Sequence, residues 1–172
     1  MIESVKRYGG FYIGRYETGN LSQEKASIIK NNSDIGNQTW YTMYKKAKGI
    51  AVNNNVTSSM IWGSQWDATM RWMYNSGNEE KKKYTYDSRG KGNYSSDSPI
   101  ATGSIEAYAV NNIYDMAGNV SDWTIEAYGT SSRVSRGGNY NDDGYSYPAS
   151  FRIDSYPTSS YDNDAFRVAL YM

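Results

Sequence analysis

The sequence contains no cysteine and no histidine among its 172 residues. Without cysteine the chain has no disulfide, no thiolate nucleophile and no cysteine-ligated zinc or iron–sulfur site. Without histidine it lacks the side chain that most often serves as a general base or as a transition-metal ligand. These two absences exclude most enzyme mechanisms before any motif is considered.

A net charge and long apolar runs are missing as well. The 18 basic and 18 acidic side chains give a formal charge of zero, so the basic footprint of a nucleic-acid-binding protein is absent. No apolar run approaches the ~20 residues needed to cross a bilayer, and no signal peptide is recognisable at the start. We therefore expect no nucleic-acid partner and no insertion into a membrane.

Aromatic residues are abundant, with 18 Tyr and 5 Trp. Disordered chains are poor in aromatic residues, because burial of aromatic side chains is a main compensation for the entropy lost on folding. A chain of this length is also long enough to bury one proper core and too short to suggest two. We expect residues 1–172 to form a single folded domain.

The first fifty residues predict one strand and one helix. Alternating large apolar and polar residues at 11–16, bounded by glycines, are typical of a strand. Thr39 is suited to cap a helix whose buried stripe has helical spacing. The residues of that stripe are Trp40, Met43, Ala47 and Ile50.

A second helix is predicted to begin after Ser58 or Ser59 and to stop at Gly77. Its stripe consists of Trp62, Trp66, Met70 and Met73. The spacing favours burial of all five tryptophans, Trp72 included, over a role in ligand binding. The polar residues 78–102 that follow are expected to form a solvated loop.

The second half of the chain predicts turns and short strands. Turn chemistry occurs at Asn111-Asn112 and at Gly118-Asn119, and residues 133–138 and 165–172 have the pattern of strands. The three arginines Arg136, Arg152 and Arg167 are expected to bond loop carbonyls or carboxylates. We predict an α+β domain in which two helices surround a mostly antiparallel, short-stranded sheet.

Residues 139–164, between the last two predicted strands, have an unusual composition. Eighteen of these 26 residues are Asn, Asp, Ser or Tyr. Tyr offers a stiff amphipathic contact surface, whereas Ser, Asn and Asp provide adaptable hydrogen bonds, and antibody loops use the same set. Five Asp and one Arg give the segment a charge of −4, which favours a basic or donor-rich ligand. Loops of this length are more often functional than passive.

Four motifs resemble, in the same order, those of the formylglycine-generating enzyme (sulfatase-modifying factor) superfamily. They are FYIGRYETG, NNIYDMAGNVSDWT, RVSRGGNY and AFRVALYM, and the resemblance covers nearly the whole chain. It implies a variant of the C-type lectin-like fold. The enzymes of the superfamily depend on active-site cysteines or on a histidine triad, both absent here, so the resemblance implies a framework without the chemistry and no cofactor.

Asn119 and Asp122 match positions of the superfamily motif that can help to bind calcium. Calcium needs six to eight oxygen ligands, and these two side chains alone favour a structural turn, with a structural calcium left open. The Glu-Pro-Asn or Gln-Pro-Asp signature of calcium-dependent sugar binding in C-type lectins is absent. Asp115 and Glu126 have no evident partner for acid–base catalysis.

The same fold occurs in variable proteins of diversity-generating retroelements, in which a reverse transcriptase alters the adenines of AAY codons near the 3′ end of a gene. Such codons yield Asn, Tyr, Ser, Asp and others, but never a stop. The resemblance implies a variable ligand-binding region at about residues 121–164. Its candidate varied positions are Ser121, Tyr128, Tyr140, Asn141, Asp142, Asp143, Tyr145, Ser146, Tyr147, Phe151, Ile153, Asp154, Ser155, Tyr156, Ser159, Ser160, Tyr161, Asp162 and Asn163.

We therefore interpret the chain as a non-catalytic receptor-binding or display domain, encoded by a phage, prophage or bacterium. Its expected partner is a cell-surface protein or glycan, its expected location is a virion tail or a cell surface, and an oligomer is left open. Two alternatives stay open at this point. One is a structural virion protein without diversified binding, and the other is an enzyme relic of the formylglycine-generating family.

Overall fold

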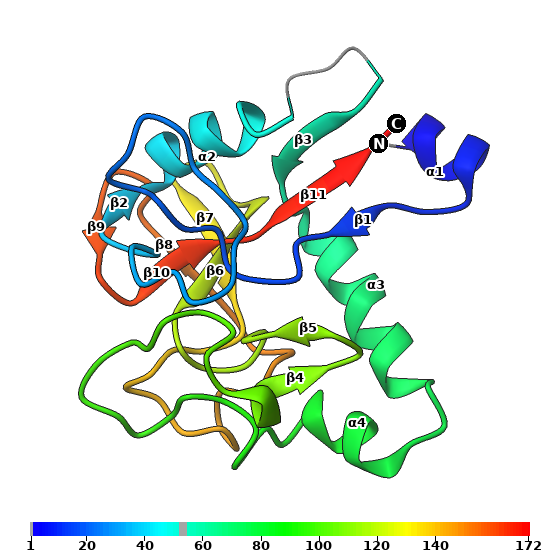
Figure 1. Cartoon of the computed structure of the whole chain (residues 1–172), viewed down its shortest axis with the longest axis vertical. Helices are drawn as coiled ribbons and strands as arrows, with labels where there is room; N and C mark the ends of the chain where they lie inside the picture. Colours follow the sequence, from blue (N-terminus) through cyan, green and yellow to red (C-terminus); the bar gives the residue numbers. More distant parts are fainter. Residues whose placement is uncertain (1, 52–54) are drawn as a thin grey trace.

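The computed structural model describes residues 2–51 and 55–172, and these form four α-helices, one 3-10 helix and eleven short strands (Figure 1). The helices are α1 (Ile2–Tyr8), α2 (Trp40–Lys48), α3 (Gly63–Tyr74), α4 (Glu79–Tyr84) and η1 (Glu106–Tyr108). The strands are β1 (Tyr12–Ile13), β2 (Gln38–Thr39), β3 (Thr57–Met60), β4 (Ala109–Val110), β5 (Ile113–Tyr114), β6 (Ser121–Tyr128), β7 (Ser132–Arg136), β8 (Arg152–Ser155), β9 (Ser160–Tyr161), β10 (Asp164–Phe166) and β11 (Val168–Tyr171).

The strands of the described chain form two main sheets, of order β1-β11-β3 and β10-β6-β7-β8, and two small pairs, β2-β9 and β4-β5. Neighbouring strands are antiparallel except for β10 and β6, which run parallel. The predicted α+β class with a mostly antiparallel, short-stranded sheet is confirmed.

Helix α2 forms where the sequence predicts it. The Thr39 side chain accepts a hydrogen bond from the backbone N–H of Thr42 at 3.3 Å, which caps the first turn. Trp40, Met43 and Ala47 are buried in one cluster with residues of β3, β6, β10 and β11. Burial of a large apolar side chain stabilises a fold by about 1.5–3 kcal/mol, so this stripe fixes the helix on the sheets.

The predicted start of the second helix is wrong. Ser58 and Ser59 lie in β3, where Ser58 pairs with Leu170 of β11, because pairing with another strand outweighs local capping preference. Helix α3 begins at Gly63 after Trp62, whose backbone N–H donates to Oε1 of Gln65 at 2.9 Å. Trp62 is therefore at the helix cap and not in the stripe, and its side chain is 38 % exposed.

Three further expectations are corrected. The polar residues 78–102 contain α4, whose first turn is capped by Asn78, and α1 was not predicted at all. The strand expected at residues 11–16 is only the two residues of β1. Trp72 is 54 % exposed, because α3 buries Trp66, Met70 and Met73 and Trp72 points about 120° away from that stripe.

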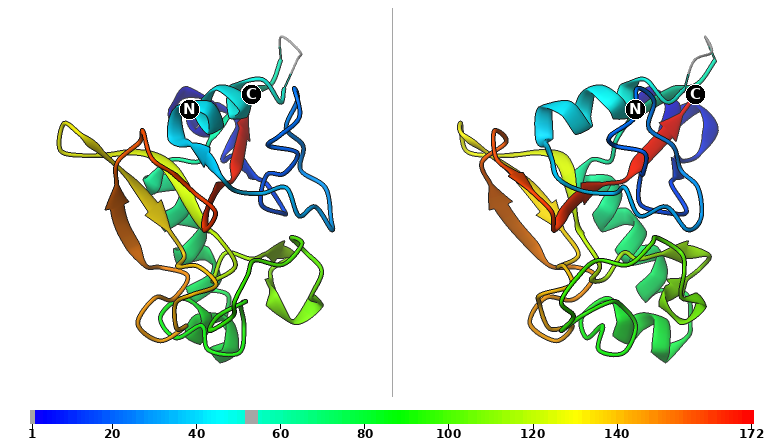
Figure 2. Two further views of the ribbon diagram at one scale, coloured as in Figure 1. Left: turned by 90° about the vertical axis from the view of Figure 1, so that its left-hand side faces the viewer. Right: turned by 60° about the vertical axis from the view of Figure 1, so that its left-hand side comes forward.

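The four-stranded sheet separates the two longest helices. Trp123 of β6, which packs in the α2 cluster, pairs with Ser135 of β7, so these two side chains are on the α2 face. The neighbouring Arg136 is on the other face, where its guanidinium forms an ion pair with Asp67 of α3. Strand β8 is the outer edge of this sheet, along one side of the molecule (Figure 2).

Candidate functional site

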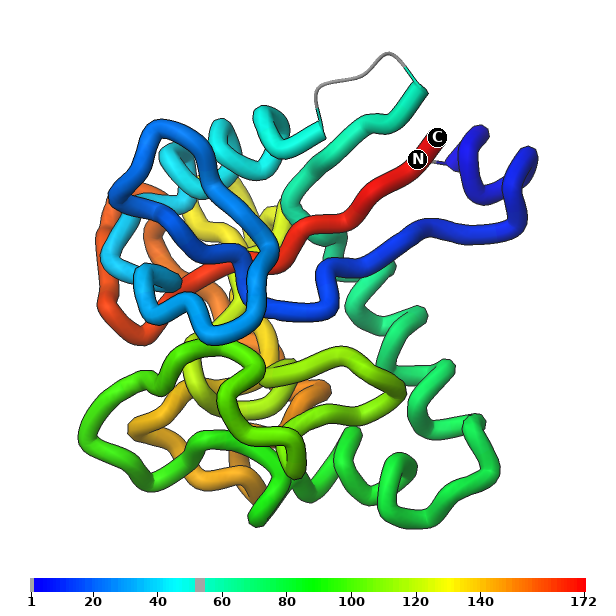
Figure 3. Tube along the Cα trace, viewed as in Figure 1, coloured from blue at the N-terminus to red at the C-terminus, as the bar shows by residue number. Residues whose placement is uncertain are grey.

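Within the predicted variable region 121–164, the tyrosine-rich residues 139–163 are divided by the fold into two parts. Residues 139–151 form a loop (loop 139–151) at the end of the molecule that also holds residues 85–100 (Figure 3). Residues 152–163 (segment 152–163) contain β8 and β9 and lie beside β7 and β2. Both parts follow the same side of the molecule in the turned views of Figure 2.

The backbone of loop 139–151 is held by main-chain hydrogen bonds to residues 85–96. The N–H of Ser88 donates to the carbonyl of Gly144 at 2.7 Å, and the N–H groups of Ser95 and Ser96 donate to the carbonyls of Asp142 and Tyr140 at 2.9 Å. These bonds use no side chain of the loop. The loop can therefore keep its path when many of its side chains are replaced.

Two aromatic residues outside the region, the half-buried Tyr94 and the buried Trp66, support the same loop. The Tyr94 hydroxyl lies 2.8 Å from the carbonyl oxygen of Tyr147 and 3.1 Å from that of Gly137, so it donates to this pair of acceptors. Burial raises the pKa of Tyr94, which keeps the donor proton in place. The indole N–H of Trp66 donates to the carbonyl of Ala149 at 2.9 Å.

Many predicted side chains lie on the surface. The exposed fractions are 53 % for Tyr128, 62 % for Tyr145, 63 % for Tyr156 and 42 % for Tyr161. The other exposed predicted residues are Asn141, Asp143, Ser146, Ile153, Ser160 and Asp162. The half-buried ones are Asp142, Tyr147, Phe151, Asp154, Ser155, Ser159 and Asn163. Large amphipathic rings that protrude from a held backbone are suited to contact a partner.

Two predicted residues are buried. Tyr140 is 5 % exposed and packs under the loop, so we place it in the framework and not among the contact residues. Ser121 is 4 % exposed, at the start of β6, and reaches the surface only as part of a pocket wall. The residues around Tyr140 in the sequence do not distinguish it from the exposed tyrosines. Its burial follows from a long-range contact, in which its backbone N–H donates to the carbonyl of Asn119 at 2.9 Å.

Two predicted carboxylates also hold the loop. Asp142 accepts from the N–H of Asn139 at 2.9 Å, and Asp143 accepts from the N–H groups of Tyr145 and Ser146 at 2.9 Å. The backbone bonds to Asp143 lower the pKa of its carboxyl group. These side chains fix the turn that presents Tyr145.

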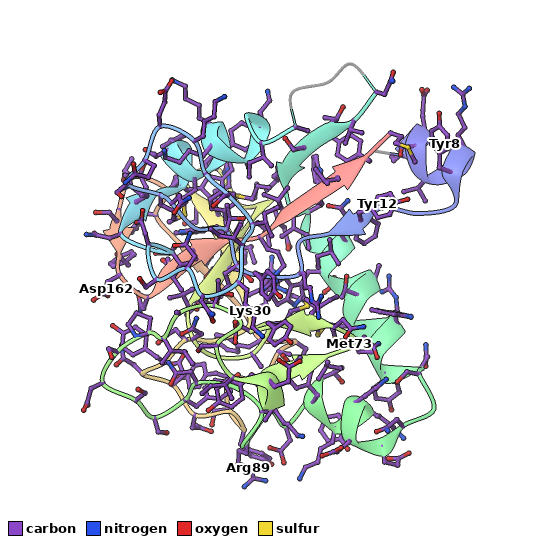
Figure 4. All side chains as sticks on the ribbon, in the orientation of Figure 1. Tyr8, Tyr12, Lys30, Met73, Arg89 and Asp162 are labelled. Carbon is purple, nitrogen blue, oxygen red and sulfur yellow. The ribbon has the colours of Figure 1, made fainter. Side chains whose placement is uncertain are left out.

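Two arginines outside the predicted list stack on exposed tyrosines. The guanidinium of Arg89 lies 4.9 Å from the ring centre of Tyr145, and that of Arg152 lies 5.4 Å from the ring centre of Tyr128. Arg89 is in the polar stretch 78–102, for which only a solvated loop was expected, and it lies at the lower edge of the molecule in Figure 4. Cation–π stacking of this kind reduces the rotational freedom of the rings before any partner binds.

A pocket of about 210 Å³ opens between the edge strand β8 and the end of segment 152–163. Six of its lining residues were predicted: Ser121, Ile153, Asp154, Ser155, Tyr161 and Asn163. The other three, Ser135, Asn139 and Asp164, were missed. Sequence periodicity placed 133–138 and 165–172 in strands, but only the sheet register brings Ser135 and Asp164 beside Ser121.

Asp164 is the buried charge of this pocket. Its side chain is 7 % exposed, and within the described residues its carboxyl group has no hydrogen-bond or ion-pair partner. Burial, with a smaller contribution from the neighbouring charge of Asp162, raises the pKa of Asp164 to about 7. Asp162 itself is at the outer edge of the molecule in Figure 4.

A family model, the sulfatase-modifying factor enzyme 1-like domain, matches residues 51–172 of the chain. The chain belongs to this family. No curated protein sequence matches it, and in the part of the chain that the structure describes no helix is long and apolar enough to cross a membrane.

Solved structures share the fold at low sequence identity. Treponema denticola variable protein 1 superimposes with a TM-score of 0.57 at 16 % identity, over 90 % of this chain and 77 % of that one. PvdO from Pseudomonas aeruginosa superimposes with a TM-score of 0.62 at 16 % identity, over 94 % of this chain and 80 % of that one. The Major Tropism Determinant U1 variant superimposes with a TM-score of 0.63 at 12 % identity, over 95 % of this chain but only 50 % of that protein's chain. The chain thus has the C-type lectin-like fold of the formylglycine-generating type.

The family motifs form the buried framework below the site. Arg167 donates from Nε to Asp122 at 3.2 Å, from Nη1 to the carbonyl of Gly14 at 2.9 Å and from Nη2 to that of Tyr114 at 2.8 Å. The Asn119 amide donates to Glu17 at 2.6 Å. Asn119 and Asp122, the two residues compared with calcium ligands, are thus both bonded within the framework, and the predicted structural role of Arg167 is confirmed.

Proposed function

We propose that the chain is a non-catalytic ligand-binding module whose region 121–164 is diversified by a retroelement. In this proposal it is a receptor-binding or display domain, encoded by a phage or prophage and presented on a virion tail or a cell surface. Its ligand is a cell-surface protein or glycan. Region 121–164 belongs to the same single domain as the framework that carries it.

One observation carries this proposal: exposed tyrosines stand on a backbone that their own side chains do not hold. Tyr145, Tyr156 and Tyr161 are 62 %, 63 % and 42 % exposed, while loop 139–151 is anchored by Ser88, Tyr94 and Trp66. Replacement of the exposed rings changes the contact surface at little cost to the fold. A protein that diversifies its ligand contacts needs this separation of roles.

Three findings support the proposal from other directions. The chain has no Cys or His, on which the enzymes of the family depend. Treponema denticola variable protein 1 and the Major Tropism Determinant, named for variability and for tropism, share the fold. The residues exposed in region 121–164 are largely those that AAY codons produce.

The first test is a sequencing experiment at the gene locus. We expect a nearby template repeat that matches the codons of region 121–164 and differs from them only at adenines. The differences should fall on exposed positions such as Tyr145 and Tyr156 and spare Tyr94 and Arg167. A locus without such a repeat would overturn diversification by a retroelement and leave binding of a fixed ligand as the function.

The second test compares two displayed libraries. In the first, Tyr128, Tyr145, Tyr156 and Tyr161 are varied over the products of AAY codons, and in the matched control four tyrosines exposed elsewhere are varied: Tyr8, Tyr12, Tyr41 and Tyr74. We expect both libraries to fold, and only the first to yield binders when selected on bacterial surface proteins and glycans. Equal yields from both would contradict a dedicated binding region, and loss of assembly without any binders would favour a structural virion protein.

A further inference from the structure

The unpartnered carboxyl group of Asp164 lies at the base of the pocket beside β8. The parallel pairing of β10 with β6 places Asp164 opposite Ser121, and the pairing across β6, β7 and β8 places Ser135 opposite Ile153. The pocket therefore has two buried hydroxyl side chains, Ser121 and Ser135, next to one buried carboxyl group. A buried carboxylate without a partner is unfavourable unless a cation or a donor compensates it.

The charges around the pocket are acidic. Asp162 lies close enough to raise the pKa of Asp164. Asp154 also lines the pocket, but along β8 its side chain alternates with that of Ile153 to the other face of the sheet. The cations nearest along the register, Arg136 and Arg152, are on that other face and pair with Asp67 and Glu126. On the pocket face Arg133 pairs with Ser155, but its guanidinium is 5.0 Å from the ring centre of Trp40 and it is not part of the pocket wall. No cation among the described residues compensates Asp164.

The walls of the pocket are suited to an aliphatic stem. Ile153 is 48 % exposed and Tyr161 is 42 % exposed, and both line the opening. A lysine or arginine side chain buries its methylene groups against such surfaces and keeps its charge at the tip. A sugar ring carries no comparable apolar stem, so these walls favour a protein ligand over a glycan.

We propose that this pocket is a subsite for one lysine or arginine side chain of a protein ligand, with Asp164 as its ion-pair partner. The proposal rests on the proposed ligand-binding function and gives it a ligand class. Ser121 and Ser135 accept hydrogen bonds from the bound cation, and Ile153 and Tyr161 pack on its stem. Asp164 is thus an unvaried ion-pair partner, whereas Ser121, Ile153 and Tyr161 beside it are candidate varied positions.

The subsite is tested with a small probe, N-acetyl-lysine methylamide, and its neutral isostere, N-acetyl-norleucine methylamide. We expect the lysine probe to bind the full chain at pH 8 at least tenfold more tightly than the isostere, measured by NMR titration. Asp164→Asn should abolish that difference, whereas Asp97→Asn, which removes an exposed carboxylate outside the pocket, should preserve it. Equal affinity of wild type and Asp164→Asn for the lysine probe would overturn the proposal.

The second measurement needs no variant, so it holds even if Asp164→Asn does not fold. The carboxyl carbon of Asp164 is followed by ¹³C NMR across pH, with and without saturating lysine probe. Bound cation should lower the pKa of Asp164 by at least one unit, and the probe should bind about tenfold more weakly at pH 6 than at pH 8, because only the ionised fraction is competent. An unchanged titration would refute the subsite.

A third experiment distinguishes a protein ligand from an amino-sugar ligand. It also allows the subsite to fail independently of the proposed diversified function. Glucosamine replaces the lysine probe as an amino-sugar cation, and tighter binding of glucosamine would overturn the assignment to a protein ligand. The probes act without any natural target. If the library selection yields binders but the lysine probe does not bind, the subsite alone is rejected. If the lysine probe binds but the library selection yields no binders, the diversified function alone is rejected.

Discussion

At the scale of single residues, Arg167 joins three distant parts of the chain. Its side chain is 0 % exposed and bonds Asp122 of β6, Gly14 and Tyr114. A buried ion pair is not by itself strongly stabilising, since both charges lose their hydration. Removal of one partner is costly, however, because the other stays buried without compensation.

We therefore expect Arg167→Met to lower the free energy of unfolding by about 3–5 kcal/mol, measured by urea denaturation. The matched control is Arg152→Met, which breaks a half-exposed pair with Glu126 and should cost about 1 kcal/mol or less. Similar losses from the two substitutions would contradict the structural role of Arg167.

At the scale of elements, loop 139–151 and residues 85–96 form one unit. The second stretch has little regular structure of its own, yet its backbone and the Tyr94 hydroxyl bond the loop at several points. The glycines at the start of the loop make this close approach possible: Gly137 and Gly138 have φ of +92° and +69°, and a Cβ on Gly138 would lie 2.6 Å from the Tyr147 carbonyl oxygen. The polar stretch is therefore the support of loop 139–151.

Tyr94→Phe tests this support. Loss of the hydroxyl leaves the carbonyl of Tyr147 without its donor, whereas that of Gly137 still accepts from the N–H of Gly118 at 2.9 Å. We expect a loss of about 1–3 kcal/mol in the free energy of unfolding. Amide hydrogen exchange should increase within residues 139–151 and change little in α2. The control Tyr86→Phe alters a ring that is 53 % exposed and should leave both measurements unchanged.

At the scale of the whole molecule, buried carboxyl groups set the dependence of stability on pH. Burial raises the pKa of Asp164 to about 7 and that of Asp122 to about 6, and it also raises the pKa values of Glu17 and Asp115. Between the unfolded pKa, about 4, and these folded values, the folded state binds more protons than the unfolded state. Stability therefore falls as pH rises from about 4 to about 7.

Asp87 has the opposite effect. Its hydrogen bonds to Arg89 lower the pKa of its carboxyl group, so its contribution is present above the unfolded pKa and is lost as pH falls below it. The two effects together place maximum stability near pH 4.

Asp164→Asn should remove part of the decline above pH 4. We expect the variant to match wild type at pH 3 and to exceed it at pH 8 by up to about 4 kcal/mol, the equivalent of a shift from 3.8 to about 7. Urea denaturation at unit steps of pH measures this, with Asp97→Asn as the control that follows wild type. A decline that persists in Asp164→Asn would assign it to other groups. A carboxylate that destabilises the free protein is consistent with one retained for a ligand.

The sequence by itself determined the class of fold, the helix at Trp40–Lys48, the roles of its framework arginines and the family. Each of these depends on local chemistry: helical spacing of apolar residues, a threonine cap, and motifs in fixed order. The composition of residues 139–164 likewise indicated a surface rich in tyrosine, and Tyr145, Tyr156 and Tyr161 are exposed.

Only the tertiary structure decided which residues of that region are exposed and which are buried as support. Tyr140 and Tyr145 belong to the same alphabet, yet main-chain bonds to Asn119 bury the first and the Asp143 turn exposes the second. Ser58 and Ser59 entered a strand because β11 was available to pair with them. Asp164 became a pocket residue because the parallel pairing of β10 and β6 set its register. Strand register and packing are non-local, since they join residues far apart in the chain, and local sequence preference does not determine them.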